Sequence, residues 1–161
     1  MPETLWAPWR MDYILDSQKP GGCVFCLPEG HLGPDEERMV LYSDSVVLLM
    51  MNRYPYNNAH VLAAPRRHVA TLSEASGRER SALMDLTARA TEVIGGLMSP
   101  DGFNIGINQG RAAGAGIDRH LHVHVTPRWE GDTNYMTALG DTRVVPEHIR
   151  RTYERLLERF R

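Results

Sequence analysis

Short apolar runs separated by turn residues come first along the chain, after an irregular beginning. Strands are expected at Met39–Tyr42, Val46–Met51 and His60–Ala64, because apolar runs of this length between polar clusters are typical of buried or half-buried strands. Residues 52–58 combine Pro55 with asparagines, and these residue types favour tight turns. The pattern therefore predicts that the second and third strands form a hairpin.

A long helix is predicted next, because the apolar spacing changes to that of a helical face. Ser76 and Glu79 have the arrangement of a capping box, in which each side chain bonds the backbone N–H of the other residue. The apolar residues that follow recur at helical spacing: Leu83, Leu86, Ala90, Val93 and Leu97. Two further strands are expected at Phe103–Asn108 and His120–Thr126, with a glycine-rich loop between them.

A second helix is predicted near the end of the chain, where Pro146 suits a first helical position. One face of this helix carries Ile149, Tyr153, Leu156 and Phe160. Short neighbouring strands with helices on one side are typical of an α+β domain with an antiparallel sheet. The pattern thus predicts an α+β fold of about five strands, with a long helix packed on the sheet and a C-terminal helix.

Length and composition indicate one ordinary globular domain, because the chain has 161 residues, 42% of them hydrophobic and 24% charged. A nucleic-acid-binding domain usually carries a strongly basic surface. This chain has a net charge of −2, so no nucleic-acid partner is expected. Lys19 is the only lysine and no glycine loop precedes it, which excludes a P-loop. No apolar run approaches the roughly 20 residues that span a bilayer. The first residues lack the pattern of a signal peptide, so a cytoplasmic location without a membrane partner is expected.

Three histidines, His120, His122 and His124, alternate with apolar residues in the last predicted strand. Side chains alternate between the two faces of a strand, so these imidazoles are expected on one surface, with the apolar residues in the core. Packing alone does not explain such a row, because imidazoles are poor core fillers. Two kinds of chemistry remain open: metal binding by imidazoles, and a nucleophilic histidine oriented by its neighbours.

The glycine-rich loop over residues 102–116 leads into this histidine row and contains Asn108, Gly114 and Gly116. Small residues let backbone N–H groups approach an anion closely, and such loops bind phosphate. A dinucleotide-binding fingerprint is absent, because Arg119 stands where its third glycine is required. The loop is therefore a candidate phosphate site beside the histidines.

Two cysteines, Cys23 and Cys26, are too few for a disulfide-stapled secreted domain. Their Cys-x-x-Cys spacing is typical either of zinc binding or of a redox pair. A redox pair is expected at the start of a helix, whereas here glycines precede the pair and Pro28 follows it. Zinc is therefore favoured, and the candidate further ligands are His31, His68 and His120.

Together these motifs resemble the histidine triad (HIT) family, whose pattern His-φ-His-φ-His-φ-φ, with φ apolar, matches residues 120–126. The resemblance extends over residues 23–130. Other matching segments are Asn52, residues 60–68, Asn108 with the following Gln-Gly, and Gly114-Ala115-Gly116. The flanking residues 7–10 and 127–135 are similar to the bacterial diadenosine tetraphosphate phosphorylase branch of the family.

The resemblance implies an enzyme that transfers a nucleotidyl group or hydrolyses a nucleotide. His122 would attack the α-phosphorus of a dinucleoside polyphosphate, such as diadenosine tetraphosphate, and form a nucleotidyl-histidine intermediate. His124 would bind the phosphate and help the leaving group depart, and His60 would lie beside His122 and orient its ring.

The resemblance also implies how the nucleotide is held. Asn52 would lie at the ribose hydroxyls. Asn108 and the backbone amides around Gly114 and Gly116 would hold nonbridging phosphate oxygens, where placed donors favour developing negative charge. Neither magnesium nor an organic cofactor is expected for this chemistry.

In the zinc-bearing branch of the family, the metal ligands fall at the positions of Cys23, Cys26, His68 and His120. The resemblance therefore implies one structural zinc ion per chain, and it divides the triad between metal and catalysis. It also implies a homodimer, paired through the helix and an edge strand. The expected layout is a single HIT domain over residues 1–161, with an arm (1–22), a core (23–130) and a C-terminal extension with a helix (131–161).

The chain departs from the family pattern in its phosphate loop. The family has glutamine and a serine or threonine after the loop glycine, whereas this chain has Ala115 and Gly116, and one residue is inserted before His120. The acceptor stays open, since water gives a hydrolase and inorganic phosphate gives a phosphorylase, which is an ATP adenylyltransferase-like activity. Three alternatives are a nucleoside phosphoramidate hydrolase, a nucleotide-binding module with little activity, and a metalloenzyme that uses all three histidines on a catalytic metal.

Overall fold

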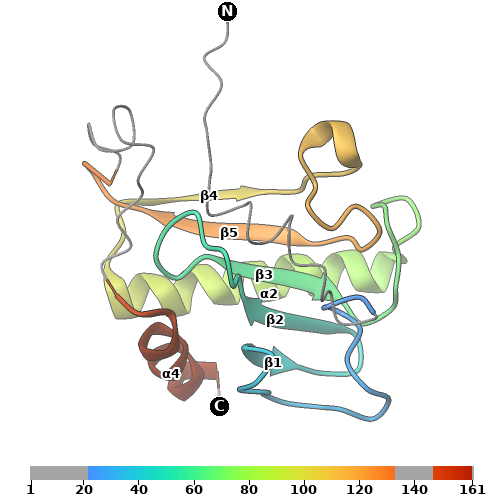
Figure 1. The fold of residues 1–161 in the computed structure, drawn as a ribbon, viewed down its shortest axis with the longest axis horizontal. Helices are drawn as coiled ribbons and strands as arrows, with labels where there is room; N and C mark the ends of the chain where they lie inside the picture. The colour runs from blue at the N-terminus through green and yellow to red at the C-terminus, as the bar shows by residue number, and fades with distance from the viewer. Residues whose placement is uncertain (1–21, 133–146, 161) are drawn as a thin grey trace, which may run out of the picture.

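The structure is a computed structural model that describes residues 22–132 and 147–160. Within these residues the chain forms an antiparallel sheet and two α-helices (Figure 1). The strands are β1 (Val40–Ser43), β2 (Val47–Met51), β3 (Val61–Pro65), β4 (Gly102–Gly106) and β5 (Val123–Arg128). The helices are α2 (Gly77–Met98), α4 (Ile149–Phe160) and a short 3-10 helix, Arg111–Ala113.

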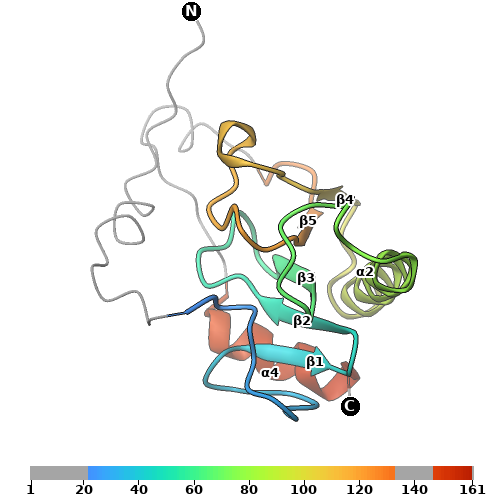
Figure 2. The same ribbon diagram turned by 90° about the vertical axis from the view of Figure 1, so that its right-hand side faces the viewer.

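The strands lie in the order β1-β2-β3-β5-β4, and every pair of neighbours is antiparallel. The predicted hairpin is confirmed, because β2 pairs with β3 from Val47 opposite Pro65 to Met51 opposite Val61. Helix α2 covers one face of the sheet, and residues 22–31 lie on the other side (Figure 2). The α+β class, the antiparallel sheet, the long helix and the C-terminal helix are confirmed.

Both faces of the central strands are buried, so β2 is buried along its whole length. Val47, Leu49 and Met51 point into the larger core cluster with α2 and α4. Leu48 and Met50 point into a smaller apolar cluster on the opposite face. The other buried members of this second cluster are Phe25, Val40, Leu62 and Ala64. The second cluster matters for function because the histidines lie on its side of the sheet.

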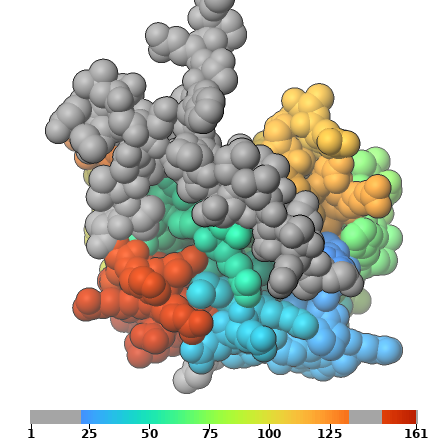
Figure 3. Space-filling view, in the orientation of Figure 1, coloured from blue at the N-terminus to red at the C-terminus, as the bar shows by residue number. Residues whose placement is uncertain are grey.

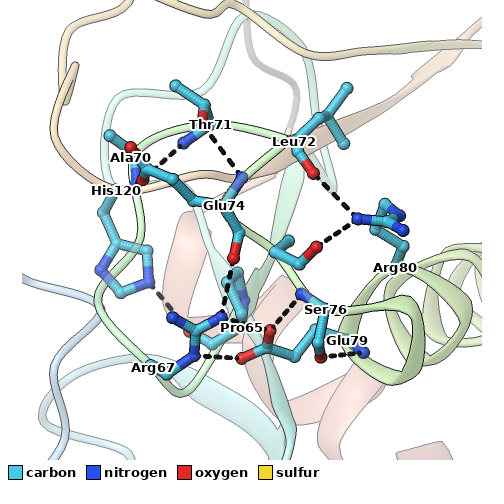
Figure 4. A network of polar contacts seen from close by, with 11 residues as sticks. Pro65, Arg67, Ala70, Thr71, Leu72, Glu74, Ser76, Glu79, Arg80 and His120 are labelled. Atoms are coloured by element: carbon cyan, nitrogen blue, oxygen red, sulfur yellow. Dashed lines mark hydrogen bonds and ion pairs between the residues drawn. The ribbon is translucent and has the colours of Figure 1, made fainter.

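Helix α2 begins at the predicted capping box. The Ser76 hydroxyl accepts a hydrogen bond from the Glu79 N–H, and the Glu79 carboxylate accepts one from the Ser76 N–H. Arg67 also binds the Glu79 carboxylate, donating from Nε at 3.0 Å and from Nη2 at 2.8 Å (Figure 4). The start of the helix is therefore fastened to the segment that follows β3.

Helix α4 packs beside β1 at one edge of the sheet (Figure 3). The Tyr153 hydroxyl donates to the Val40 carbonyl at 2.9 Å, and Leu156 and Phe160 are buried in the larger core. The fully buried Thr152 hydroxyl lies 3.0 Å from Asn58 Oδ1 in the β2–β3 loop. The last helix thus supports the loop that leads to His60.

Each predicted strand differs from the observed one by one or more residues at its ends, and two of these differences have a clear cause. β5 begins at Val123 rather than His120, because the backbone N–H of Leu121 donates to the Val69 carbonyl instead of joining the ladder. β4 ends at Gly106 rather than Asn108, and Gln109 beyond it accepts a hydrogen bond from the N–H of Leu72. In both places a loop contact replaces the strand pairing.

Several predictions fall outside the described residues. These are the arm apart from Gly22, the start of the last helix at Pro146, and the flanking similarities at residues 7–10 and 133–135. No helix in the described ranges is long and apolar enough to cross a bilayer.

Candidate functional site

The three histidines face the side of the sheet opposite α2. Leu121, Val123 and Val125 point into the larger core, as the alternation predicted. His124 lies opposite Leu62, a member of the second cluster. The rings of His120 and His122 contact Phe25 in the same cluster. The alternation continues through His120 and His122 although these residues precede β5.

His60 and His124 form a hydrogen-bonded pair, with 2.9 Å between His60 Nε2 and His124 Nδ1. His60 Nδ1 accepts from the backbone N–H of Tyr56 at 3.1 Å. A backbone N–H can only donate, so neutral His60 carries its proton on Nε2 and donates it to His124. His124 then carries its own proton on Nε2. The bond to His124 is a contact that the sequence did not predict, and it shows that His60 orients the ring of His124.

His122 has the opposite tautomer. Its Nδ1 lies 2.8 Å from the carbonyl oxygen of His120, and a carbonyl can only accept, so the proton is on Nδ1. Nε2 therefore holds the lone pair. Burial lowers the pKa of His122, outweighing the opposite effect of the hydrogen bond to His120, so the ring is neutral at pH 7. An unprotonated Nε2 is what a nucleophilic histidine needs.

The β2–β3 loop builds one wall of this site. Asn52 Oδ1 accepts from the N–H of Tyr54 at 3.0 Å, and Asn52 Nδ2 lies 3.2 Å from His60 Nδ1. The ring of Tyr56 stacks on His60 with the centroids 4.9 Å apart. Tyr56 was not singled out from the sequence. Its position four residues before His60 is a signal only once the hairpin turn is known.

The glycine-rich loop returns over the histidine side of the sheet, because Ile117 packs against the second cluster. Gly114 has φ +81°, a conformation that glycine adopts without strain. Its N–H donates to the Arg111 carbonyl at 3.0 Å, and the N–H of Ala115 lies 3.4 Å from the Gly110 carbonyl. The amide of Gly114 is thus used by the turn itself. Asn108 lies half-buried just before this turn.

Cys23, Cys26, His68 and His120 come together at the other end of the histidine row. One ligand atom from each of the four lies within 4.8 Å of the others. The closest approaches are 3.2 Å, from Cys23 Sγ to His120 Nδ1 and from Cys26 Sγ to His68 Nδ1. Two sulfurs and two imidazole nitrogens are a common ligand set for zinc. This cluster could therefore hold a metal ion.

The protonation of the cluster suits a metal. His120 Nε2 donates to the Pro65 carbonyl at 2.8 Å, which leaves the Nδ1 lone pair directed at the cysteines. Burial lowers the pKa of His120 to about 4, so the imidazole is neutral. Burial, and then the neighbouring Cys23, raise the pKa of Cys26 to about 11, so a bound cation would have to displace that proton.

His31 is not part of the cluster, although its sequence position made it a candidate ligand. Its Nε2 atom is the one buried side-chain nitrogen or oxygen without a hydrogen-bond partner in the described part of the chain. His60 and His68 belong to different sites, since His60 bonds His124 and His68 contacts Cys26. Phe25 was missed, and its place between the two cysteines is the signal that could have found it.

Comparison with known proteins supports the family. The HIT domain family matches residues 34–131. The AP-4-A phosphorylase of Mycobacterium tuberculosis is 37% identical over 159 residues, which cover 93% of this chain and 80% of that protein. The asymmetrical bis(5'-nucleosyl)-tetraphosphatase of Schizosaccharomyces pombe is 32% identical over 93 residues, which cover 58% of this chain and 50% of that protein.

Among solved structures, a zinc-bound histidine triad family protein from Mycobacterium smegmatis has the same fold. It has a TM-score of 0.63 and 23% identity, with 76% of this chain and 83% of that chain covered. The match to the family over residues 34–131 and the phosphorylase relative confirm the resemblance seen in the sequence. The chain belongs to the histidine triad (HIT) family.

Proposed function

We propose that this protein cleaves dinucleoside polyphosphates, such as diadenosine tetraphosphate, by nucleotidyl transfer through His122. The observation that carries the proposal is the hydrogen bond from His122 Nδ1 to the His120 carbonyl, which leaves Nε2 unprotonated. The substrate class is supported by the names of two relatives, an AP-4-A phosphorylase and a bis(5'-nucleosyl)-tetraphosphatase. The family supports a nucleotide substrate in general.

In the first step, the lone pair of His122 Nε2 attacks the α-phosphorus. A nitrogen–phosphorus bond forms while the bond from phosphorus to the bridging oxygen breaks, and the rest of the polyphosphate leaves. Dividing one displacement into two in this way lowers the barrier of each. The proton stays on Nδ1, and its hydrogen bond to the His120 carbonyl stabilises the positive charge that develops on the ring as Nε2 attacks.

His124 is proposed to protonate the leaving oxygen. The hydrogen bond from His60 Nε2 to His124 Nδ1 puts the His124 proton on Nε2. His124 is part of β5 and its ring centroid lies 4.9 Å from that of His122, so both can reach one phosphate. A positioned general acid of this kind contributes about 10² to 10⁴ in rate.

The substrate-holding residues are proposed from the family pattern. Asn52 would hold the ribose, although its amide also orients the β2–β3 loop. Asn108 would hold a nonbridging oxygen. Gly114 would act through its backbone conformation, because its own N–H donates to the Arg111 carbonyl. Gly116 would contribute backbone groups of the same loop to phosphate binding.

The second step depends on the acceptor. Water would release a nucleoside monophosphate from His122, as in a hydrolase, whereas inorganic phosphate would release a nucleoside diphosphate, as in a phosphorylase. We propose phosphate as the acceptor, because the phosphorylase relative is similar over 93% of the chain. This makes the activity ATP adenylyltransferase-like.

We further propose that Cys23, Cys26, His68 and His120 hold one structural zinc ion. The donor set and the free Nδ1 of His120 fit this metal. When bound, zinc would cross-link separate segments of the chain and would take no part in bond breaking. The proposal leaves His122 and His124 for catalysis.

A homodimer in the cytoplasm is also proposed. Strand β4 is at the edge of the sheet, and Ile105 on it is 49% exposed. Exposed edge strands with apolar side chains favour pairing with another chain. A sedimentation mass of one chain at micromolar concentration would contradict the dimer.

The function is tested by incubating the protein with diadenosine tetraphosphate, with and without inorganic phosphate, and resolving the products. We expect ADP and ATP, formed only when phosphate is present. AMP and ATP without phosphate would make water the acceptor. The variant His122→Ala should lose turnover, and retained turnover in this variant would refute the nucleophile. If no product forms, nucleoside phosphoramidates are the next substrates to test.

A further inference from the structure

Phe25 joins the candidate metal site to the proposed nucleophile. It lies between Cys23 and Cys26 in the sequence, and its side chain is fully buried. Its ring centroid is 5.0 Å from that of His122, with the planes 30° apart, and 5.1 Å from that of His120. One aromatic ring therefore contacts both a metal-ligand candidate and the histidine that is proposed to attack.

The turn that carries Phe25 has few polar attachments to the rest of the protein. The N–H of Cys26 donates to the Cys23 carbonyl at 3.0 Å, which closes the turn on itself. Within residues 22–27, the hydrogen bonds to other described segments all involve the two sulfur atoms, which contact His68 and His120. Apart from these contacts, the segment is held by apolar packing on the second cluster, in which Phe25 is fully buried and Cys23 and Leu27 are partly buried.

His120 provides a second link between the two sites. Its ring belongs to the metal cluster through Nδ1, and its carbonyl oxygen accepts the Nδ1 proton of His122 at 2.8 Å. The ring itself is anchored by the bond to the Pro65 carbonyl. A change in the position of His120 would therefore move the acceptor that selects the tautomer of His122.

We propose that a metal ion bound by Cys23, Cys26, His68 and His120 holds His122 in its attacking orientation through Phe25, which acts as a positioning residue. The inference rests on the proposed role of His122 and adds a function for the metal site. The bound metal would then affect the rate of the first chemical step as well as the stability of the fold.

The physical reason is the difference in strength between metal bonds and thiol hydrogen bonds. With metal bound, the Cys23–Cys26 turn is cross-linked to His68 and His120, and the Phe25 ring is fixed against His122. Without metal, the sulfurs make only weak hydrogen bonds, because a thiol is a poor donor and acceptor. The turn can then shift, and the ring of His122 loses one neighbour and the fixed position of its acceptor. Both changes reduce the time that Nε2 points at the phosphorus.

The experiment uses the full-length protein labelled with ¹⁵N at histidine, loaded with zinc, and without nucleotide. The ring signals of His122 are assigned by their loss in His122→Ala. We expect a single Nδ1–H tautomer with zinc bound, and exchange between tautomers after zinc is removed with a chelator. With diadenosine tetraphosphate, kcat should fall by about 10- to 100-fold on zinc removal, the usual range for loss of a supporting residue around a metal.

A pair of variants separates positioning from folding. Phe25→Leu keeps an apolar side chain but removes the ring, and zinc content and circular dichroism verify that it is folded and loaded. We expect it to show the exchanging tautomers and the lower kcat at full zinc occupancy. Val24→Ala is the matched control, because Val24 belongs to the same turn but is 43% exposed. It should behave as the unchanged protein.

The outcomes distinguish this inference from the proposed function. Unchanged His122 signals and unchanged kcat in zinc-loaded Phe25→Leu would overturn the inference, even if chelation unfolds the protein. The ring signals are recorded without substrate, so a metal-dependent tautomer in a protein that turns over no nucleotide would support the coupling and refute the function. Turnover that is lost in His122→Ala but unchanged in Phe25→Leu would support the proposed function and overturn the coupling through Phe25.

Discussion

Hydrogen bonds to backbone atoms set the protonation of the functional histidines one by one. The N–H of Tyr56 makes His60 a donor from Nε2, and the carbonyl of His120 makes His122 a donor from Nδ1. His122 therefore presents an unprotonated Nε2 to a phosphate, whereas its neighbour His124 presents a protonated Nε2. The sequence shows which residues are histidines, but it does not show which nitrogen of each carries the proton.

At this scale we expect that His60→Ala lowers kcat for diadenosine tetraphosphate by about 10²-fold, the lower end of the range for general acid catalysis. The loss of the donor to His124 Nδ1 allows His124 to carry its proton on the wrong nitrogen. KM should change much less than kcat. His148→Ala is a suitable control, because His148 is exposed, precedes α4 and lies outside the histidine row. Equal kcat values for the two variants would contradict the role of His60.

Helix α2 shows how an element is fastened by a few polar contacts at its first turn. Glu79 caps the helix through the N–H of Ser76 at 2.7 Å and binds Arg67 through both carboxylate oxygens. The ion pair joins the helix to the residue before His68. Arg80 Nη1 also donates a hydrogen bond to the Leu72 carbonyl, which ties the first turn of the helix to the preceding loop (Figure 4). The cap was predictable from sequence spacing, whereas Arg67 was not, because it lies outside the helix.

The capping contacts predict a pH dependence of stability. Chiefly through Arg67, the pKa of Glu79 falls from 4.5 to about 2 in the folded protein. The carboxylate therefore adds stability above pH 4.5 and loses that contribution as the pH falls toward 2. Glu79→Gln should lower the free energy of unfolding at pH 7 by about 1 kcal/mol, the usual value of a cap. Its unfolding should also depend less on pH in this window.

Chemical denaturation between pH 2 and 7 measures this effect. Glu92→Gln is the matched control, because Glu92 is exposed on the same helix. If Glu79→Gln and the control show the same pH profile, the capping carboxylate does not contribute as described.

On the scale of the whole molecule, the metal cluster connects segments that are distant in the sequence. Cys23 and Cys26 precede β1, His68 follows β3, and His120 precedes β5. A ligand that binds only the folded protein stabilises it, by about 4 kcal/mol at a free concentration 1,000 times its dissociation constant. Metal loading and global stability should therefore change together.

We accordingly expect elemental analysis to find about one zinc per chain in protein purified with zinc, since a four-ligand site holds one ion. Cys23→Ala should reduce the zinc content and lower the melting temperature. A chelator should destabilise the original protein more than this variant. Protein that carries no zinc after careful loading would contradict the metal site.

The sequence by itself determined the kinds of elements and the residues with chemistry. Short apolar runs identified the strands, and alternation identified the common face of the histidines. Helical spacing and the Ser76–Glu79 box identified α2, and the HIT pattern identified the family. These are local signals, because side-chain periodicity follows directly from the geometry of a strand or helix. Strand ends were less accurate, since loop contacts such as Leu121 to Val69 compete with the ladder.

Only the tertiary structure decided which histidine contacts which partner. His60 bonds His124, and Phe25 lies between the metal site and the nucleophile. Each of these facts depends on strand register and on loops that meet across the sheet, with sequence separations of 64 residues for His60 and His124 and 97 for Cys23 and His120. Local spacing carries no information about such contacts, because they arise when distant segments pack on the same face.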